Sequence, residues 1–302
     1  MMILSPQRVM VLQRSSDMKR PHSRASQETA QTAALVCKSL ASHGVEVVSN
    51  PDDRASHDDL IEHNVDLIIV IGGDGTILFG SQIARELDVP LLGINTGHVG
   101  FLAEVEAEDV DKVIHQVIHG NIMIEERMTL DVEVRRPDGS VEFGWALNEA
   151  ALDKRDRSRV VDVAIGVDGQ AVSSFGCDGL IVSTPTGSTA YAFSCGGPIL
   201  WPDLQALLLV PVAAHALFTR PLVVGPHSCL ELGVAHSGGG GCDIWCDGRR
   251  SIDAPEGSLI RVRAGEQPVR LVRVTDAPFS ERLVAKFHLP VDGWRAVADS
   301  ED

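Results

Sequence analysis

The first 122 residues carry short, continuous apolar runs separated by segments in which apolar residues recur every three or four positions. Continuous apolar runs are typical of strands buried on both faces of a parallel sheet, and a period near 3.6 is typical of amphipathic helices. This alternation predicts a doubly wound α/β domain with a parallel sheet. The expected strands are Val9–Gln13, Val45–Val48, Asp66–Ile71 and Pro90–Ile94, and the expected helices are Ser26–His43, Ile77–Leu87 and Asp109–His119.

From Met123 onward the period changes to two, the spacing at which side chains of a strand point to opposite faces. Turn signals such as Asp168-Gly169 separate these segments, which favours antiparallel strands over βαβ units. The pattern predicts an all-β, sandwich-like domain over residues 123–275. The last segment, 276–302, regains a helical pattern at Glu281–Phe287 and is expected to dock back on the first domain. The expected strands are Thr129–Arg135, Val160–Val167, Ser228–Val234, Ser258–Ala264 and Val269–Val274.

Length and hydrophobicity narrow the class of protein. A chain of 302 residues suits two domains, and a hydrophobic share of 44% is enough for two packed cores. The longest apolar runs, such as Leu67–Ile71 and Leu207–Val212, are far shorter than the roughly 20 residues that cross a bilayer. Met1–Leu4 is not followed by the apolar region of a secretory signal. We therefore expect a cytoplasmic protein without a membrane partner.

Charge and cysteine content argue against two further roles. The formal net charge of −16 opposes nonspecific attraction to nucleic acid, so no nucleic-acid partner is expected. The six cysteines are scattered along the chain and are expected to be free thiols in a reducing compartment. Cys242 and Cys246 lack a second pair at zinc-finger spacing, so we expect no metal site there.

The segment Gly72-Gly73-Asp74-Gly75-Thr76 directly follows an expected buried strand and directly precedes an expected helix. At such a place the helix N-terminus offers N–H groups to phosphate, and glycine lets the backbone approach closely. The segment matches neither the G-x-G-x-x-G fingerprint nor a Walker A sequence. We assign Asp74 as a general base for the proton of a substrate alcohol. The alternative is that Asp74 only caps the helix that follows.

A second glycine-bearing turn, Asn95–Leu102, follows the expected strand Pro90–Ile94. Turns at the ends of neighbouring parallel strands line one crevice, so His98 and Phe101 are expected to face a ligand. The alternative for His98 is a turn histidine bonded to the backbone.

The most informative stretch is Asp178–Tyr191, in which the expected strand Leu180–Ser183 runs into a turn with five hydroxyl side chains. Hydroxyl groups bond sugar hydroxyls, phosphates and base edges, although Ser and Thr also cap backbone groups in ordinary turns. Tyr191 is the only tyrosine of the chain. Asn148-Glu149 is a weaker signal: the amide can pair with an adenine edge and the carboxylate can accept from ribose hydroxyls, but a plain surface turn remains the alternative.

Taken together, four segments resemble the NAD kinase family, of the bacterial type that uses ATP or polyphosphate, in identity, order and spacing. Diacylglycerol kinases, sphingosine kinases and phosphofructokinases carry similar glycine turns, but the combination with Thr184–Tyr191 is highly specific. The resemblance covers most of the chain and implies an α/β domain plus a β-sandwich-like domain. The implied reaction phosphorylates the 2′-hydroxyl of the adenosine ribose of NAD to give NADP. The four segments are Gly72–Thr76, Asn95–Leu102, Asn148-Glu149 and Asp178–Ser194.

The resemblance also implies roles for single residues. Asp74 is the implied proton acceptor, and Gly73, Gly75 and Thr76 are implied to hold the donor phosphates with Mg²⁺ or another divalent cation. Gly176 stands where many relatives have a basic residue, so one contact to the diphosphate or carboxamide is missing or differently supplied. Relatives usually form dimers or tetramers, which implies a homodimer or homotetramer here. The other implied contacts to the nucleotide or NAD are His98, Phe101, Asn148, Glu149, Arg159, Asp178, Thr189, Ala190, Tyr191, Ser194 and Arg249.

Two other functions stay open from the sequence alone. A lipid or sugar kinase would use the same glycine turn, but it leaves Asn148-Glu149 and Asp178–Ser194 unexplained. A non-catalytic NAD(P)-binding sensor would use the same scaffold, but it gains little from a carboxylate at the phosphate turn. Asp74 therefore favours an enzyme.

Overall fold

The computed structural model describes residues 6–13, 24–49, 64–96, 100–103, 105–106, 109–216, 219–236, 238, 240–275 and 277–291. These residues divide into two compact units. The α/β unit comprises the described residues up to 126 and from 270 onward, and the β unit comprises those within 127–269. The two units are described separately below.

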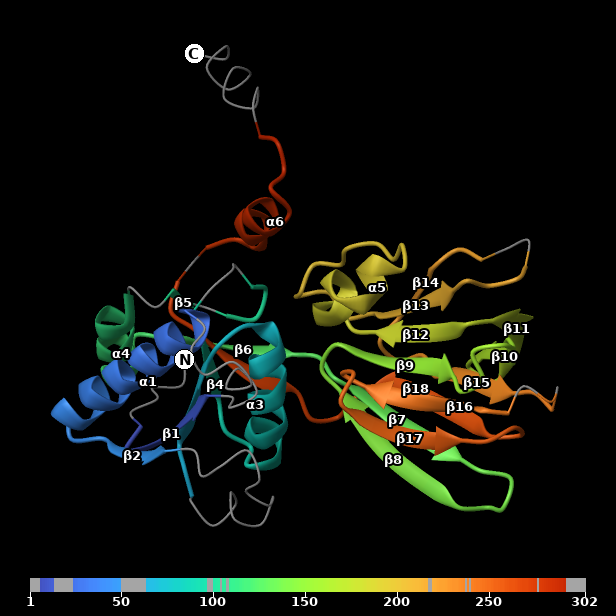
Figure 1. Cartoon of the computed structure of the whole chain (residues 1–302), viewed down its shortest axis with the longest axis horizontal. Helices are drawn as coiled ribbons and strands as arrows, with labels where there is room; N and C mark the ends of the chain where they lie inside the picture. Colours follow the sequence, from blue (N-terminus) through green and yellow to red (C-terminus); the bar gives the residue numbers. More distant parts are fainter. Residues whose placement is uncertain are drawn as a thin grey trace. The chain divides into compact units, whose positions relative to one another are not determined.

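The α/β unit is built on a seven-stranded sheet with the order β2-β1-β3-β4-β19-β6, to which β5 adds by pairing with β4 (Figure 1). The pairs β1–β2, β1–β3, β3–β4, β4–β5 and β4–β19 are parallel. The predicted parallel α/β core is therefore confirmed. The strands are β1 (Arg8–Gln13), β2 (Glu46–Ser49), β3 (Leu67–Ile71), β4 (Leu91–Asn95), β5 (Val105–Glu106), β6 (Met123–Arg127) and β19 (Val269–Arg273). The helices are α1 (Arg24–Ser42), α3 (Asp74–Glu86), α4 (Val110–Ile118) and α6 (Phe279–Phe287).

Helices cover both faces of this sheet because β3 is apolar at every position. Leu67, Ile69 and Ile71 share one core cluster with residues of α1 and α4. Val70 points to the opposite face, where it lies against α3: a Cβ on Gly80 of that helix would come within 2.3 Å of a Val70 methyl carbon. Glycine at this position therefore lets α3 approach the sheet closely.

The β unit consists of two antiparallel six-stranded sheets that share one apolar core. One sheet has the order β11-β10-β15-β18-β7-β8, and the other has the order β14-β13-β12-β9-β16-β17. Alternating burial along β7 and β18 shows why the pattern has period two: one face packs inward and the other meets solvent. The strands of the first sheet are β7 (Leu130–Arg135), β8 (Val141–Ala146), β10 (Val161–Val167), β11 (Gln170–Cys177), β15 (Leu230–Val234) and β18 (Leu259–Ala264). Those of the second are β9 (Glu149–Lys154), β12 (Gly179–Ser183), β13 (Leu207–Val212), β14 (Leu222–Val224), β16 (Cys242–Cys246) and β17 (Arg250–Ala254), followed after β12 by the short helices η3 (Thr186–Thr189) and α5 (Tyr191–Ser194).

Two strands lie in a different sheet from the one that the sequence pattern suggested. Residues 123–275 were expected to belong to the β domain, yet β6 and β19 both join the sheet of the α/β unit. The pattern identified β19 as a strand, but an apolar period says nothing about which strand will be its neighbour. Its partner β4 precedes it by more than 170 residues, as the pair Leu271 and Leu91 shows.

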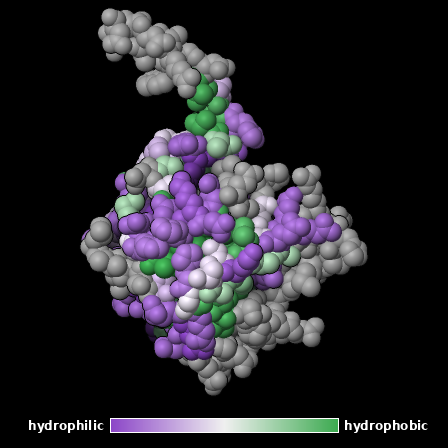
Figure 2. All heavy atoms as spheres, turned by 90° about the vertical axis from the view of Figure 1, so that its left-hand side faces the viewer, coloured by the Kyte–Doolittle hydropathy of each residue, from purple (hydrophilic) through white to green (hydrophobic). Residues whose placement is uncertain are grey.

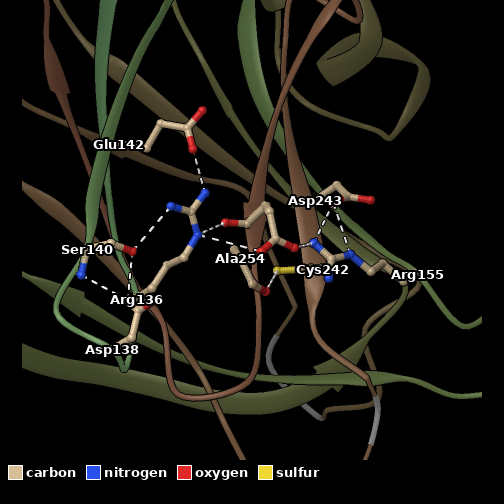
Figure 3. Close-up of polar contacts among 9 residues, drawn as sticks. Arg136, Asp138, Ser140, Glu142, Arg155, Cys242, Asp243 and Ala254 are labelled. Atoms are coloured by element: carbon tan, nitrogen blue, oxygen red, sulfur yellow. Dashed lines mark hydrogen bonds and ion pairs between the residues drawn. The ribbon is translucent and has the colours of Figure 1, made fainter.

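Arginine side chains join neighbouring strands at one margin of the β unit (Figure 3). Arg155 binds Asp243 of β16 and Asp253 of β17, and Arg136 donates to the main-chain carbonyl of Asp253 at 2.9 Å. Arg136 also forms an ion pair with Glu142 of β8 at 2.5 Å. These side chains are partly exposed, so each pair contributes about 0–1 kcal/mol. We regard this network as support for strand pairing.

One face of the α/β unit is mostly polar among the described residues. Figure 2 shows hydrophilic residues spread over the face in view, with hydrophobic residues in small groups among them. Within the described ranges, none of the helices combines the length and apolar character required to span a bilayer.

Candidate functional site

The glycine turn lies where β3 ends and α3 begins. Gly72 has φ 145°, a region that L side chains rarely adopt, and a Cβ there would come within 2.8 Å of the Thr76 hydroxyl oxygen. Helix α3 begins at Asp74, three residues before the predicted start, with Gly73 as its N-cap and no side-chain cap bond. The first N–H groups of a helix have no intrahelical acceptors, so this turn presents donors suited to phosphate.

Asp74 does not act as the helix cap. Its two carboxylate oxygens accept hydrogen bonds from the main-chain N–H groups of Phe101 and Leu102, at 3.2 and 3.1 Å. The neighbouring residue must be small, because a Cβ on Gly100 would lie 2.3 Å from a carboxylate oxygen. Asp74 is only half-buried, while Gly73 and Gly75 beside it are exposed. The carboxylate is thus held in place by two main-chain N–H groups, and the residue keeps part of its surface exposed between two exposed glycines.

Phe101 contributes to this arrangement through its main chain. The sequence suggested that its ring faces a ligand, but the ring is only 8% exposed and packs against Phe279 and Phe287 of α6, with ring centroids 5.7 and 5.8 Å away. The ring anchors the segment while the N–H group binds Asp74. His98, the other expected contact in this turn, lies outside the described residues.

In the β unit, Asn148 and Glu149 lie at the start of β9, next to the end of β12. Both are 7% exposed, so they are not a plain surface turn. Asp247, just past β16, accepts hydrogen bonds from the N–H groups of Leu147 and Asn148, at 3.0 and 2.7 Å. It also forms an ion pair with Arg250 at 3.0 Å. A buried carboxylate therefore fixes the main chain that presents Asn148 and Glu149.

Glu149 is a buried acid whose pKa lies far above the usual range of a glutamate. Burial raises its pKa to about 8, with a further rise from nearby Asp247 and an opposing hydrogen bond from the main chain of Tyr191. Its second oxygen, Oε2, is buried and has no hydrogen-bond partner among the described residues. A protonated carboxyl can donate as well as accept, so Glu149 is suited to bind a ligand hydroxyl group.

The hydroxyl-rich run after β12 largely satisfies its own main chain. Thr184 donates to the carbonyl of Leu147 at 2.6 Å, and Ser188 donates to that of Pro185 at 2.7 Å. Ser183, Thr184 and Ser188 are fully buried. These three hydroxyl groups therefore follow the alternative given for the run, in which Ser and Thr satisfy main-chain groups of a tight turn. The run instead shapes the backbone that carries the remaining candidates.

The remaining candidates of the β unit fall into two places. Thr189 and Ala190 are partly exposed, and Tyr191 and Ser194 are exposed on the short helical segment beside Glu149. Asp178 lies at the opposite end of β12 from Ser183 and pairs with Lys154 at 2.5 Å. Two further candidates complete the set: Arg159, in the loop before β10, donates to the carbonyl of Gly238, and Arg249, in the turn between β16 and β17, is partly exposed.

Sequence reasoning missed three residues that hold these groups in place. Asp247 stood in a turn from which only Arg249 was selected. Arg127 is buried and donates to the hydroxyl of Thr186 at 3.3 Å, and Arg282 donates to main-chain carbonyls of the segment that binds Asp74. Only Asp247 carried a usable signal, namely its place beside glycine in a predicted turn.

The donor groups present fit a divalent cation that arrives with a nucleotide. The part of the chain that the structure describes contains no cluster of three or more His, Cys, Asp or Glu able to hold a metal. Mg²⁺ commonly uses one or two carboxylates and takes its other oxygen ligands from phosphates and water. The turn Gly73–Thr76 would hold such a cation together with the phosphates of the nucleotide, which would supply most of its oxygen ligands.

A glycine turn at a helix start, with a fixed carboxylate on a parallel sheet, is typical of nucleotide-dependent phosphotransferases, and the β unit adds a buried amide and a buried acid. Comparison with known families agrees. Residues 4–122 match the ATP-NAD kinase N-terminal domain and residues 147–274 match the ATP-NAD kinase C-terminal domain. The chain belongs to the ATP-NAD kinase family.

Individual relatives support this membership. The chain is 53% identical over 230 residues to NAD kinase 2 of Streptomyces coelicolor, covering 76% of each chain. It is 47% identical over 291 residues to the NAD kinase of Corynebacterium diphtheriae, covering 91% of each. Its fold is similar to an Archaeoglobus fulgidus NAD kinase in complex with ATP, with TM-score 0.72 and 29% identity over 93% of this chain and 98% of that one. A yeast NADH kinase complexed with NADH has the same fold, with TM-score 0.83 and 23% identity over 95% and 89%.

Proposed function

We propose that the chain transfers the γ-phosphoryl group of ATP to the 2′-hydroxyl oxygen of the adenosine ribose of NAD, giving NADP and ADP. The observation that carries this proposal is the Asp74 carboxylate, held by the N–H groups of Phe101 and Leu102 at a glycine turn. The relatives named NAD kinase indicate the substrates. They do not favour the other two functions, a lipid or sugar kinase and a non-catalytic sensor.

Asp74 is the general base in this proposal. Phosphoryl transfer needs little covalent chemistry from the protein, and the main requirements are positioning of the reactants and stabilisation of charge. As the new bond to phosphorus forms, the accessible side of the carboxylate accepts the proton of the 2′-hydroxyl group. The turn Gly73–Thr76 binds the phosphates of the donor through the main-chain N–H groups of Gly73 and Gly75, while the N–H group of Thr76 donates to the carbonyl of Gly73 at 2.8 Å and closes the turn. A divalent cation bound with the donor at this turn would supply neutralisation of the charge on the phosphate oxygens.

The β unit supplies the NAD site. Asn148 binds the adenine edge through its side-chain amide, and Glu149, protonated at neutral pH, binds a ribose hydroxyl group. Tyr191 contacts the ligand through its exposed ring. The further contacts in this proposal are Arg159, Asp178, Thr189, Ala190, Ser194 and Arg249, and in the α/β unit His98 and Phe101. Phe101 acts there through its main chain.

The proposal extends to assembly, donor and place of action. Neighbouring subunits of a homodimer or homotetramer complete the NAD site, polyphosphate is an alternative donor, and the protein acts in the cytoplasm. Sedimentation of the purified protein tests assembly, and turnover with polyphosphate in place of ATP tests the donor.

A coupled assay tests the reaction itself. Purified protein with NAD, ATP and Mg²⁺ is expected to form NADP, and phosphorus NMR of the product should place the new phosphate on the 2′ oxygen. Replacement of NAD by a sugar or a diacylglycerol should give no turnover. Tight binding of NADP without any turnover would instead indicate a sensor.

A further inference from the structure

We propose that the C-terminal helix α6 positions the Asp74 carboxylate for catalysis and that Arg282 is the positioning residue through which it acts. This inference rests on the proposed role of Asp74 as the base. Arg282 lies in the middle of α6 (Phe279–Phe287) and is far from Asp74 in the sequence.

A continuous series of hydrogen bonds joins Arg282 to Asp74. The Arg282 guanidinium donates to the main-chain carbonyls of Phe101 and Ala103, at 3.3 and 2.9 Å. The N–H groups of Phe101 and Leu102 donate to the Asp74 carboxylate. The segment between them is thus gripped by a cation on its carbonyl side and by a carboxylate on its N–H side.

One peptide group carries both interactions. The carbonyl of Phe101 and the N–H group of Leu102 belong to the same planar peptide unit, which cannot bend. A positive charge at the carbonyl oxygen polarises that unit and strengthens the hydrogen bond that its N–H group donates, because chained hydrogen bonds polarise one another. Arg282 therefore acts on both the position of the Asp74 carboxylate and the strength of its hydrogen bond.

Aromatic contacts hold α6 on the same segment. The Phe101 ring lies between Phe279, at the start of α6, and Phe287, at its end. None of the residues of α6 is itself buried, so the helix lies on the surface of its unit, and these ring contacts and the Arg282 bonds join it to the segment that holds Asp74. Loss of Arg282 should loosen the helix and the segment together.

The segment has open space beside it, which makes it dependent on Arg282. A pocket of about 320 Å³ lies between α4 and α6, and Gly100, Ala103, Lys112 and Arg282 are among its lining residues. Close packing would hold a loop without help, but a loop beside a cavity is free to shift towards it. Such a shift would pull the two N–H groups away from Asp74.

Steady-state kinetics of Arg282→Gln test the proposal. We expect kcat to fall about 10- to 100-fold, since a misplacement of about 1 Å can cost 10²-fold, while KM for NAD stays within about twofold. Arg282→Lys keeps one donor and the charge and should recover part of the loss. Phe279→Leu keeps the apolar contact but removes the ring that packs on Phe101, so it should lower kcat less than Arg282→Gln does. If Arg282→Gln folds poorly, Phe279→Leu replaces it in the test, and an unchanged kcat would then count against the proposal.

Arg270→Gln is the matched control. Like Arg282, Arg270 donates to a main-chain carbonyl, here that of Asp88, past the other end of α3. Arg270 also donates to the Asp88 carboxylate. If Arg270→Gln lowers the melting temperature as much as Arg282→Gln and leaves kcat within about twofold, the effect of Arg282 is specific to the segment. A kcat for Arg282→Gln within threefold of the parent enzyme would overturn the proposal.

A double variant separates this inference from the proposed role of Asp74. In an Asp74→Asn background, Arg282→Gln should cause no further loss of kcat, because the group that it positions is gone. An equal further loss would show that Arg282 does not act through Asp74. If Asp74→Asn keeps its turnover, the role of Asp74 fails and the inference with it; if Asp74→Asn loses turnover and Arg282→Gln keeps it, only the inference fails.

Discussion

Each unit of the molecule contains a carboxylate that binds two consecutive main-chain N–H groups of a segment distant in sequence. In the α/β unit, Asp74 binds those of Phe101 and Leu102. In the β unit, Asp247 binds those of Leu147 and Asn148. In both cases each carboxylate oxygen accepts one of the two N–H groups, but the surroundings of the two carboxylates differ.

The difference lies in access and charge. The Asp247 side chain has no exposed surface and pairs with Arg250, so its hydrogen bonds and its charge stabilise the fold. Asp74 is half-buried between exposed glycines. A carboxylate enclosed on all sides can only position its neighbours, whereas one with an open side can also meet a substrate. Four predictions test this contrast.

Asp74→Asn should have the largest effect. The amide keeps the size of the side chain but loses basicity, and a positioned base typically contributes 10²–10⁴-fold in rate. We expect kcat to fall by that factor with NAD affinity, measured by calorimetry, nearly unchanged. Asp88→Asn serves as the control, because Asp88 is an exposed aspartate beyond the other end of α3. Near-normal turnover of Asp74→Asn would remove the basis for its role.

Asp247→Asn should mainly affect stability. The substitution leaves Arg250 without its ion pair, and breaking a buried pair typically costs about 3–5 kcal/mol. Because Arg250 is partly exposed, we expect the free energy of unfolding to fall by an amount near the lower end of that range. KM for NAD should rise because Asn148 and Glu149 lose their support. Asp138→Asn is the matched control, since Asp138 also accepts a main-chain N–H group but is fully exposed. Equal melting temperatures for the two variants would contradict the assignment.

Glu149→Gln should change the pH dependence of stability. Burial raises the pKa of Glu149 to about 8, above the usual 4.5, so the folded protein holds a proton that the unfolded chain releases between those values. The free energy of unfolding should therefore fall as the pH rises from about 4.5 to 8, by an amount on the order of a few kcal/mol. The variant holds no such proton and should show a shallower fall in urea denaturation. Parallel curves for both proteins would show that Glu149 ionises normally.

Two glycine substitutions should give the smallest and most selective effects. In Gly100→Ala the new Cβ would lie 2.3 Å from the Asp74 carboxylate, so kcat should fall about tenfold with little change in melting temperature. In Gly187→Ala it would lie 2.1 Å from the main-chain oxygen of Asn148, so stability should fall by about 1–3 kcal/mol. Gly225→Ala, where nothing lies within 4 Å, is the control. A loss of stability in Gly100→Ala together with a loss of kcat in Gly187→Ala would contradict the comparison.

The sequence was most informative where local chemistry decides the structure. The continuous apolar run at Leu67–Ile71 and the glycine turn after it predicted a buried parallel strand followed by a helix start. The alternation from Thr129 onward predicted antiparallel strands. These features depend on side-chain period and backbone freedom, which a sequence displays directly.

The sequence was least informative where partners come from far along the chain. Nothing local indicates that β19 pairs with β4, that Asp247 binds the main chain at Asn148, or that Arg282 binds the segment next to Asp74. The hydroxyl-rich sequence around Thr184 and Ser188 is compatible with a ligand site, but in the structure both hydroxyl groups donate to main-chain carbonyls. Composition shows which bonds a residue can form, and only the fold shows which it has formed.

The position of β19 between β4 and β6 has a consequence for biosynthesis. A ribosome makes β1 to β6 first and the entire β unit next, and only then the strand that fills the gap in the first sheet. The α/β unit therefore emerges with an interior strand missing, and its sheet closes only when Val269–Arg273 leaves the exit tunnel. Since α6 follows later still, a nascent chain would complete the hydrogen bonds from Arg282 to the segment that holds Asp74 among the last events of its synthesis.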